Sequence, residues 1–192
     1  MIQKLKDKLT RRSKSRIVDF ERIPSAVLIP IYKREGECYI LFTQRTNTVR
    51  AHKGQISFPG GAYEERDKTL LNTALRESCE EIGLARKDIK VLGELDDFVT
   101  ATSNFVISPF VAVIPWPYKF KPDPVEVDEI IEIPVSALLD KNSYSWEKVV
   151  DGGSIVDSHV YRYNEKFIWG ATAEMLNQFL SIWTEFMDNT GR

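Results

Sequence analysis

The chain has 192 residues, of which 43% are hydrophobic and 28% are charged, and its formal net charge is −2 at pH 7. This is the composition of an ordinary globular protein, which excludes a disordered or fibrous chain. General nucleic-acid binders usually carry a clear excess of lysine and arginine, so we expect no nucleic-acid partner. The length suits a single domain over residues 1–192.

The first 20 residues are basic and begin MIQKLKDKLTRRSKSR, without the hydrophobic core of a signal peptide. Sparse apolar residues at Ile2, Leu5 and Leu9 favour a solvated helix packed through one stripe, with an organelle-targeting or membrane-surface helix as the alternative. No run approaches the roughly 18 apolar residues that span a bilayer. Cys38 and Cys79 have neither metal-ligand spacing nor the density of a disulfide scaffold. We therefore expect a cytoplasmic protein without a membrane partner, either a monomer or a homodimer.

The first half of the chain predicts a hairpin, a helix and two further strands. Residues 25–33 and 38–45 are rich in β-formers and flank the short sequence REGE, which predicts a hairpin. After a loop, residues 69–82 predict a helix that ends at Gly83. Residues 88–100 and 104–115 each suggest a strand, the second with a break at Pro109.

In the second half, prolines in residues 115–124 predict a loop, and alternation in residues 127–134 predicts a strand. Pro134 then opens a short helix through Ala137 and Leu139. Residues 158–163 and 166–170 predict a closing hairpin around Asn164 and Glu165, and residues 171–187 a last helix. Strands, a helix, more strands and a helix in this order predict an α/β fold with a mixed sheet sandwiched by helices.

The predicted helix at 69–82 carries Glu77, Glu80 and Glu81 within one turn. At 100° per residue these carboxylates fall inside an arc of about 100°. Like charges at this spacing destabilise an isolated helix by about 0.2–0.5 kcal/mol per pair, which a bound cation would offset. The helix is expected to present the acidic face to solvent and to bury the opposite side, formed by Leu71, Leu75, Cys79 and Ile82.

Carboxylates without histidine or thiolate select hard cations such as Mg²⁺ or Mn²⁺, which proteins commonly share with substrate phosphates. Such ions neutralise phosphate oxygens and lower the pKa of a bound water. Gly60 and Gly61 let a backbone group approach the ion or the phosphate, and Arg76 could clamp a neighbouring carboxylate. The plain alternative is a solvated acidic surface after an ordinary Gly–Gly turn.

FPGG, Asp67 and the RE-xx-EE-x-G run together resemble the Nudix box, G-x5-E-x7-R-E-U-x-E-E-x-G-U, where U is aliphatic. Asp67 replaces a glutamate, eight residues rather than seven separate it from Arg76, and Ser78 stands at an aliphatic position. The box spans about residues 61–84. Its positions are occupied here by Gly61, Asp67, Arg76, Glu77, Glu80, Glu81, Gly83 and Leu84.

The preceding segment, LFTQRTNTVRAHKGQISFPGG, resembles the narrower signature of the coenzyme A pyrophosphatases, L-L-T-x-R-[SA]-x3-R-x3-G-x3-F-P-G-G. Phe42 and Thr46 are mild substitutions. Further resemblance in SPFVAVIP, EVDEIIEIPV and FIWGATAEML extends the likeness over about residues 25–180. The matching residues of the signature are Leu41, Thr43, Arg45, Arg50, Gly54, Phe58, Pro59, Gly60 and Gly61.

This resemblance implies an α/β/α sandwich around a mixed sheet. It implies Mg²⁺- or Mn²⁺-dependent hydrolysis of the pyrophosphate of coenzyme A (CoA) or acyl-CoA to 3′,5′-ADP and 4′-phosphopantetheine or its acyl form. Glu77 and Glu81 would be metal ligands, and Glu80 a third ligand, a ligand through water or the base that accepts the proton of the attacking water. Arg76 would orient the carboxylates.

Several residues outside the box have alternative interpretations. Arg45, Arg50 and Lys53 could contact the 3′-phosphate or the pyrophosphate, or could be surface cations. Glu126 is a possible alternative base, although a solvated loop acid is the simpler interpretation, and His52 is most simply a loop histidine. Three loop aromatics could stack on adenine, line a pantetheine channel or cap a core edge: Trp116, Tyr118 and Phe120.

Two other functions stay open at this point. One is a pyrophosphatase for another nucleoside diphosphate derivative, and the other is a catalytically silent module that binds CoA or a nucleotide. The presence of all three box glutamates argues against the silent module.

Overall fold

The computed structural model describes residues 2–46 and 54–188. Within these residues the main sheet has eight strands. β1 and β7 are parallel at its centre and the other pairings are antiparallel, so the sheet is mixed, as expected. The strands are β1 (Ile23–Arg34), β2 (Glu37–Arg45), β3 (Ile56–Ser57), β4 (Gly60–Ala62), β5 (Lys90–Glu94), β6 (Phe98–Val99), β7 (Phe105–Val113) and β8 (Val127–Pro134).

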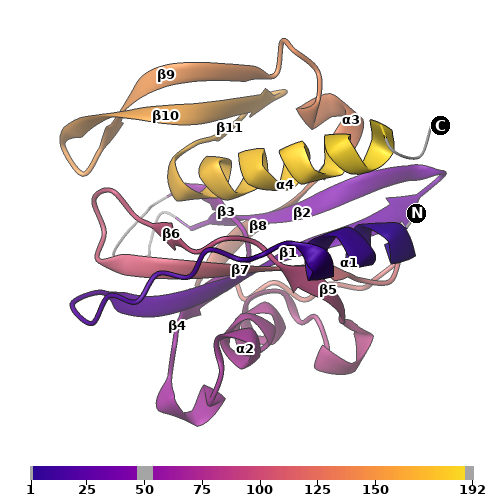
Figure 1. Ribbon diagram of the computed structural model, residues 1–192, viewed down its shortest axis with the longest axis horizontal. Coiled ribbons are helices and arrows are strands. Elements are labelled where there is room, and N and C mark those ends of the chain that lie inside the picture. The colour runs from indigo at the N-terminus through magenta and orange to yellow at the C-terminus, as the bar shows by residue number, and fades with distance from the viewer. Residues whose placement is uncertain (1, 47–53, 189–192) are drawn as a thin grey trace.

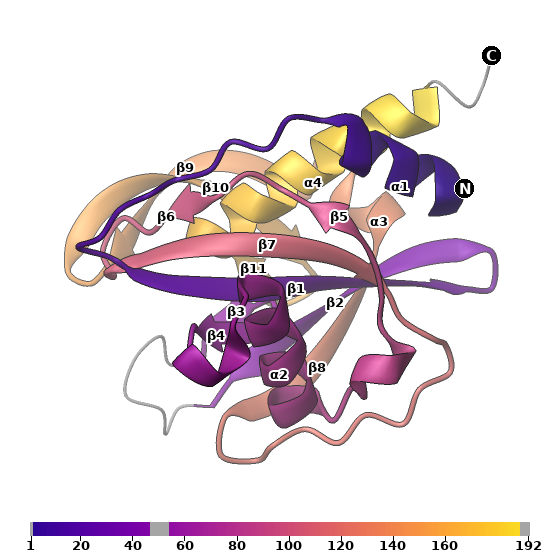
Figure 2. The same ribbon diagram turned by 60° about the horizontal axis from the view of Figure 1, so that its bottom comes forward.

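Helices cover both faces of this sheet (Figures 1 and 2). α2 (Leu70–Ile82) packs on one face against β1 and β4, whereas α1 (Ile2–Arg11) and α4 (Gly170–Asp188) lie on the other. Because successive side chains of a strand alternate between faces, Leu28 of β1 joins the buried cluster under α2 and Ile29 joins the cluster under α4. The fold is therefore the expected α/β/α sandwich.

β7 continues through Pro109, so the expected break in that strand is wrong. Pro109 pairs with Val27 of β1, and its other side faces the interval between β5 and β6. Its carbonyl oxygen accepts a hydrogen bond from the Leu95 N–H there, at 3.0 Å. A proline nitrogen has no hydrogen to donate. Here that nitrogen lies on the side between the end of β5 and the start of β6, so no ladder hydrogen bond is lost.

A second sheet of three strands lies beside α4, within the described residues. β10 (Ser154–Tyr163) and β11 (Lys166–Ile168) form the expected hairpin, with Asn164 at φ 52° in the turn. β9 (Tyr144–Asp151) pairs with β10 and is not among the expected strands. Its apolar side chains Trp146 and Val150 are exposed, so it lacks the pattern of a half-buried strand. α3 (Val135–Leu138) is the short helix expected after Pro134.

The basic N-terminal segment is bound to acidic residues of the same chain. α1 buries Leu5 and Leu9, as a single apolar stripe predicts. Beyond it, Lys14 lies 2.8 Å from a Glu94 carboxylate oxygen and 2.7 Å from one of Asp97. None of the helices in residues 2–46 and 54–188 is both long and apolar enough to cross a membrane.

Candidate active site

α2 has well-defined ends that fix the position of its acidic turn. The Thr69 side chain accepts a hydrogen bond from the Asn72 N–H at 3.2 Å, which caps the start of the helix. Gly83, at φ 68°, ends it in the left-handed conformation that favours glycine. Glu77, Glu80 and Glu81 therefore occupy the last turns of the helix, close to the sheet.

The acidic face of α2 is not uniformly exposed, in contrast to the expectation. Glu81 is only 3% exposed, and Cys79, expected in the core, is exposed. The helix packs on the β1–β4 pair, where Gly60 and Gly61 present backbone instead of side chains, and it turns Ser78 and Glu81 inward. Ser78 is fully buried, and its hydroxyl donates to the Ala74 carbonyl oxygen at 2.7 Å. A small residue thus suits the box position where an aliphatic one is usual.

Glu77 and Glu81 lie directly against the two glycines. Glu81 Oε2 accepts a hydrogen bond from the Gly60 N–H at 3.2 Å. A Cβ atom on Gly61 would lie 2.4 Å from Glu77 Oε1, so only glycine leaves room for that carboxylate. Burial raises the pKa of Glu81 to about 8 and also raises the pKa of Glu77. The glycine turn and the acidic helix therefore form one site.

Arg76 connects the carboxylates around it. Its Nε and Nη2 donate to the two carboxylate oxygens of Asp67 at 2.8 and 3.0 Å. Its Nη1 donates to Glu77 Oε1 at 2.8 Å and to Glu80 Oε2 at 2.9 Å. The hydrogen bonds from Arg76 hold the pKa of the Asp67 carboxyl well below its usual range. Arg76 thus fixes the direction of Glu77 and Glu80, while Asp67 anchors Arg76.

A cleft of about 990 Å³ opens beside this network. Gly60, Gly61, Glu77, Arg45 and Glu126 are among its lining residues. The Arg45 guanidinium lies 3.7 Å from a carboxylate oxygen of Glu81 and 3.8 Å from one of Glu126, which is too long for a hydrogen bond. Its Nε is buried without a hydrogen-bond partner. Arg45 therefore retains donors for an anionic group bound in the cleft.

Other expected site residues lie elsewhere. Glu80 is half exposed and does not line this cleft, and one of its carboxylate oxygens lies 3.6 Å from the Arg66 guanidinium. Trp116 stacks on Tyr32 with ring centroids 4.7 Å apart. With Tyr118 and Phe120 it packs against the core under α2, which agrees with the core-edge interpretation. Arg50, His52 and Lys53 lie outside the described residues.

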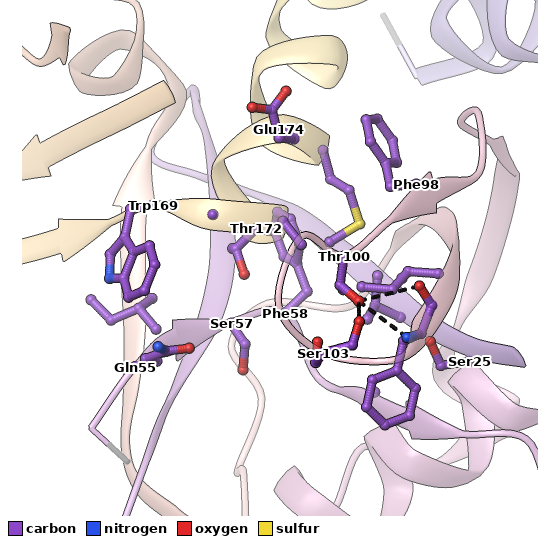
Figure 3. A pocket seen from close by; sticks show the side chains of 18 of the residues that line it. Ser25, Gln55, Ser57, Phe58, Phe98, Thr100, Ser103, Trp169, Thr172 and Glu174 are labelled. Carbon is purple, nitrogen blue, oxygen red and sulfur yellow. Dashed lines mark hydrogen bonds between the residues drawn. The ribbon is translucent and has the colours of Figure 1, made fainter. Parts of the chain in front are cut away.

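The cleft also contains residues that the motifs do not single out. It extends from Glu77 of the box to the β6–β7 connection and to the start of α4. Figure 3 shows Trp169 and Phe98 on opposite sides, with Thr172 between them. These residues come from segments far apart in the sequence, so no single spacing identifies them. The one available signal is the FIWGATAEML segment, which contains Trp169, Thr172 and Glu174.

The donor chemistry fits a hard divalent cation. Glu77 and Glu81 supply only carboxylate oxygens, the ligands that such a cation prefers. Glu81 is buried and no lysine or arginine among the described residues donates a hydrogen bond to it, so its negative charge is unfavourable until a cation binds. As the side chains stand, no three histidine, cysteine or acidic groups in the described part of the chain are grouped as a metal site. Arg76 occupies the space between Glu77 and Glu80. The complete set of metal ligands stays a prediction.

The chain is similar to known proteins in sequence and in fold. The NUDIX domain model matches residues 22–150. An uncharacterized Nudix hydrolase NudL of Photorhabdus laumondii is 34% identical over 154 residues, which cover 80% of this chain and 81% of the relative. Its namesake from Yersinia enterocolitica is 37% identical over 156 residues, with 80% and 78% coverage. The crystal structure of a MutT/nudix family protein from Enterococcus faecalis gives a TM-score of 0.61 at 13% identity, covering 95% of this chain and 73% of that one. At this identity the structural likeness concerns the fold alone.

Proposed function

The chain belongs to the Nudix family of hydrolases, and we propose that it hydrolyses the pyrophosphate bond of CoA or acyl-CoA. One observation carries the proposal: the CoA-type signature and the Nudix box meet in space. From the signature, Gly60 donates to Glu81 of the box, and Arg45 lies 3.7 Å from the same carboxylate. Addition of water to the P–O–P bridge gives 3′,5′-ADP and 4′-phosphopantetheine or its acyl form.

In this proposal Glu77 and Glu81 bind Mg²⁺ or Mn²⁺. When bound, the cation neutralises diphosphate oxygens and lowers the pKa of a bound water. Arg76 and the Gly60 N–H hold the two carboxylates in place through the hydrogen bonds described above. Arg45 donates to the diphosphate, since its guanidinium has no close carboxylate partner and its planar fork suits two phosphate oxygens.

The base that accepts the proton of the attacking water has two candidates. Glu126 lines the same cleft as Glu77, whereas Glu80 lies outside it and is bonded to Arg76. A base must reach its water within hydrogen-bond distance, so the geometry favours Glu126. Glu80 keeps the alternative roles of a third metal ligand or a ligand through water.

We further propose a single functional domain that includes the N-terminal segment. Lys14 and Arg12 precede the segment that the family model matches, residues 22–150. Their side chains pair with acidic residues at the β5–β6 connection, which lies within that segment. We also propose that the enzyme acts in the cytoplasm on a small-molecule substrate, as a monomer or a homodimer.

Turnover of defined substrates tests the proposal. The protein is incubated with Mg²⁺ or Mn²⁺ and CoA, dephospho-CoA, NADH or ADP-ribose, and 3′,5′-ADP is quantified. CoA should have the highest kcat/KM, and removal of its 3′-phosphate should lower that value. No turnover of CoA or of any acyl-CoA would refute the substrate assignment. Turnover of another substrate in the panel alone would support a different nucleoside diphosphate derivative.

Variants of the acidic turn test the residues. Glu77→Gln and Glu81→Gln should each lower kcat by orders of magnitude while the protein stays folded. Glu65→Gln is the matched control, since Glu65 is exposed and lies outside the cleft. Wild-type activity in both site variants would remove Glu77 and Glu81 from the metal site. Tight CoA binding without hydrolysis in the wild type would identify a silent binding module.

A further inference from the structure

The cleft has a second part that the proposed chemistry does not use. We call it the arm pocket and define it by Phe98, Val99, Val156, Trp169, Thr172 and Met175. These residues come from β6, β10, the β11–α4 junction and the first turns of α4, and α4 covers the opposite face of the main sheet from α2 (Figure 1). The arm pocket and the acidic turn lie in one continuous cleft. A molecule whose diphosphate lies at Gly60 and Glu77 can therefore extend into it.

The charge of the lining distinguishes the two ends of a CoA molecule. Among the described residues that line the cleft, Arg45 is the one lysine or arginine, and it lies at the Glu81 end. Near the arm pocket the cleft is lined by Asp151, Asp157 and Glu174. Lys148 pairs with Asp157 at 3.4 Å and His159 Nε2 lies 3.5 Å from a Glu174 carboxylate oxygen, but no described lysine or arginine is within ion-pair distance of Asp151 or Glu174. This end disfavours the 3′-phosphate of the ADP half, whereas the pantetheine half is uncharged.

The remaining lining suits a neutral chain of amides and methylene groups. Phe98 and Trp169 provide apolar walls on two sides (Figure 3). Thr172 is only 8% exposed, and its hydroxyl makes no hydrogen bond within the described residues, nor does that of Ser103. Apolar walls with a few unpaired hydroxyls bind molecules that are mostly apolar with occasional polar groups.

We propose that the arm pocket binds the pantetheine arm and the acyl chain of acyl-CoA, so that acyl-CoA is preferred over free CoA. The inference rests on the proposed function, since it places the diphosphate at the acidic turn. It assigns substrate selection to β6, β10 and α4 and leaves the ADP half near Arg45. Each methylene buried there should raise kcat/KM by about threefold to fourfold until the pocket is filled.

Val99 and Val156 allow a direct test because neither belongs to the acidic turn. Val99 is 43% exposed and Val156 is half buried, so a glutamate at either position adds charge to the pocket with little effect on the core. Val150→Glu is the matched control, since Val150 is 70% exposed on the β9–β10 hairpin and does not line the cleft. Thermal unfolding verifies that all three variants are folded.

Calorimetry on the whole protein with Mg²⁺ measures binding of two product-type ligands, octanoyl-4′-phosphopantetheine and 3′,5′-ADP. Val99→Glu and Val156→Glu should weaken the first by about tenfold or more and leave the second within about twofold, while Val150→Glu changes neither. For the wild type, kcat/KM should increase from CoA to acetyl-CoA to octanoyl-CoA. Both pocket variants should show a smaller increase in kcat/KM along the same series.

The outcomes separate the two proposals. The arm pocket is overturned if the pocket variants weaken binding of 3′,5′-ADP alone, or if neither variant binds the two ligands differently from Val150→Glu. This holds even if the protein hydrolyses CoA. Selective weakening of octanoyl-4′-phosphopantetheine binding in a protein that hydrolyses neither CoA nor any acyl-CoA supports the arm pocket and refutes the proposed function. If one pocket variant misfolds, the other variant and the wild-type kinetics with the three substrates still test the proposal. Equal kcat/KM of the wild type for CoA, acetyl-CoA and octanoyl-CoA would contradict the arm pocket.

Discussion

Gly60 and Gly61 are adjacent, yet a methyl group at each would meet a different obstacle. On Gly61 a Cβ would lie 2.4 Å from Glu77 Oε1 and 2.6 Å from its carboxylate carbon. On Gly60 it would lie 2.3 Å from the Ala26 carbonyl oxygen and 2.6 Å from the Val27 Cα. Neither glycine has a positive φ, so an alanine adds contact without backbone strain. The first obstacle is the end of a side chain, and the second is the backbone of the central strand.

Gly61→Ala should therefore affect activity more than stability. The Glu77 carboxylate must move by about 1 Å to reach an ordinary contact, which breaks its 2.8 Å hydrogen bond from Arg76. Loss of that bond lowers the free energy of unfolding by about 1–2 kcal/mol. Displacement of a catalytic group by about 1 Å can lower the rate by about 10²-fold. We expect a folded protein with weaker Mn²⁺ binding and kcat/KM lower by about two orders of magnitude.

Gly60→Ala should instead destabilise the fold. β1 pairs with β2, β4 and β7, so its backbone cannot shift without disturbing several ladders. We expect a loss of at least about 3 kcal/mol, at the upper end for overpacked sites. Urea unfolding of both variants and Mn²⁺ titration of Gly61→Ala are the measurements. Equal stability of the two variants, or wild-type Mn²⁺ affinity and activity in Gly61→Ala, would refute this reasoning.

Three further variants test the charged residues. Burial raises the pKa of Glu81 to about 8, whereas the unfolded chain loses this proton near 4.5. In the presence of a chelator, the metal-free folded protein therefore becomes less stable as the pH rises between these two values. Glu81→Gln should remove this loss, seen as a smaller fall in urea midpoint from pH 5 to pH 9; an unchanged fall would contradict it. Arg76→Lys cannot maintain the paired contacts to Asp67 and should lower kcat by at least about tenfold in the activity assay, and wild-type kcat would argue against a positioning role. Lys14→Met leaves the Asp97 carboxylate buried without its 2.7 Å partner and should lower the free energy of unfolding by about 2–4 kcal/mol, whereas a loss below about 0.5 kcal/mol would contradict that.

Local sequence patterns are sufficient for most of the fold. The helix at 70–82, its end at Gly83 and the first hairpin follow from capping, glycine and alternation, which act within a few residues. Pro109 shows the limit of such rules. Whether a strand tolerates a proline depends on which neighbour needs its N–H, and that neighbour is set by the tertiary structure.

The candidate site was predictable in part. Motif spacing brings Glu77, Glu81 and the glycines into one group, but helical periodicity alone places Glu81 on the solvated face. Its burial depends on packing α2 over a stretch of β4 without side chains, which a helical projection does not contain. The wall of the arm pocket also escapes prediction, because β6, β10 and α4 come together only in the folded chain.

Binding of Mn²⁺ at the acidic turn is the central claim, and anomalous diffraction from a crystal soaked with Mn²⁺ tests it most directly. The peak should lie between the carboxylates of Glu77 and Glu81, beside Gly60 and facing the cleft. A cleft without anomalous density at saturating Mn²⁺, or a peak on the Glu80 and Arg66 side alone, would contradict the account.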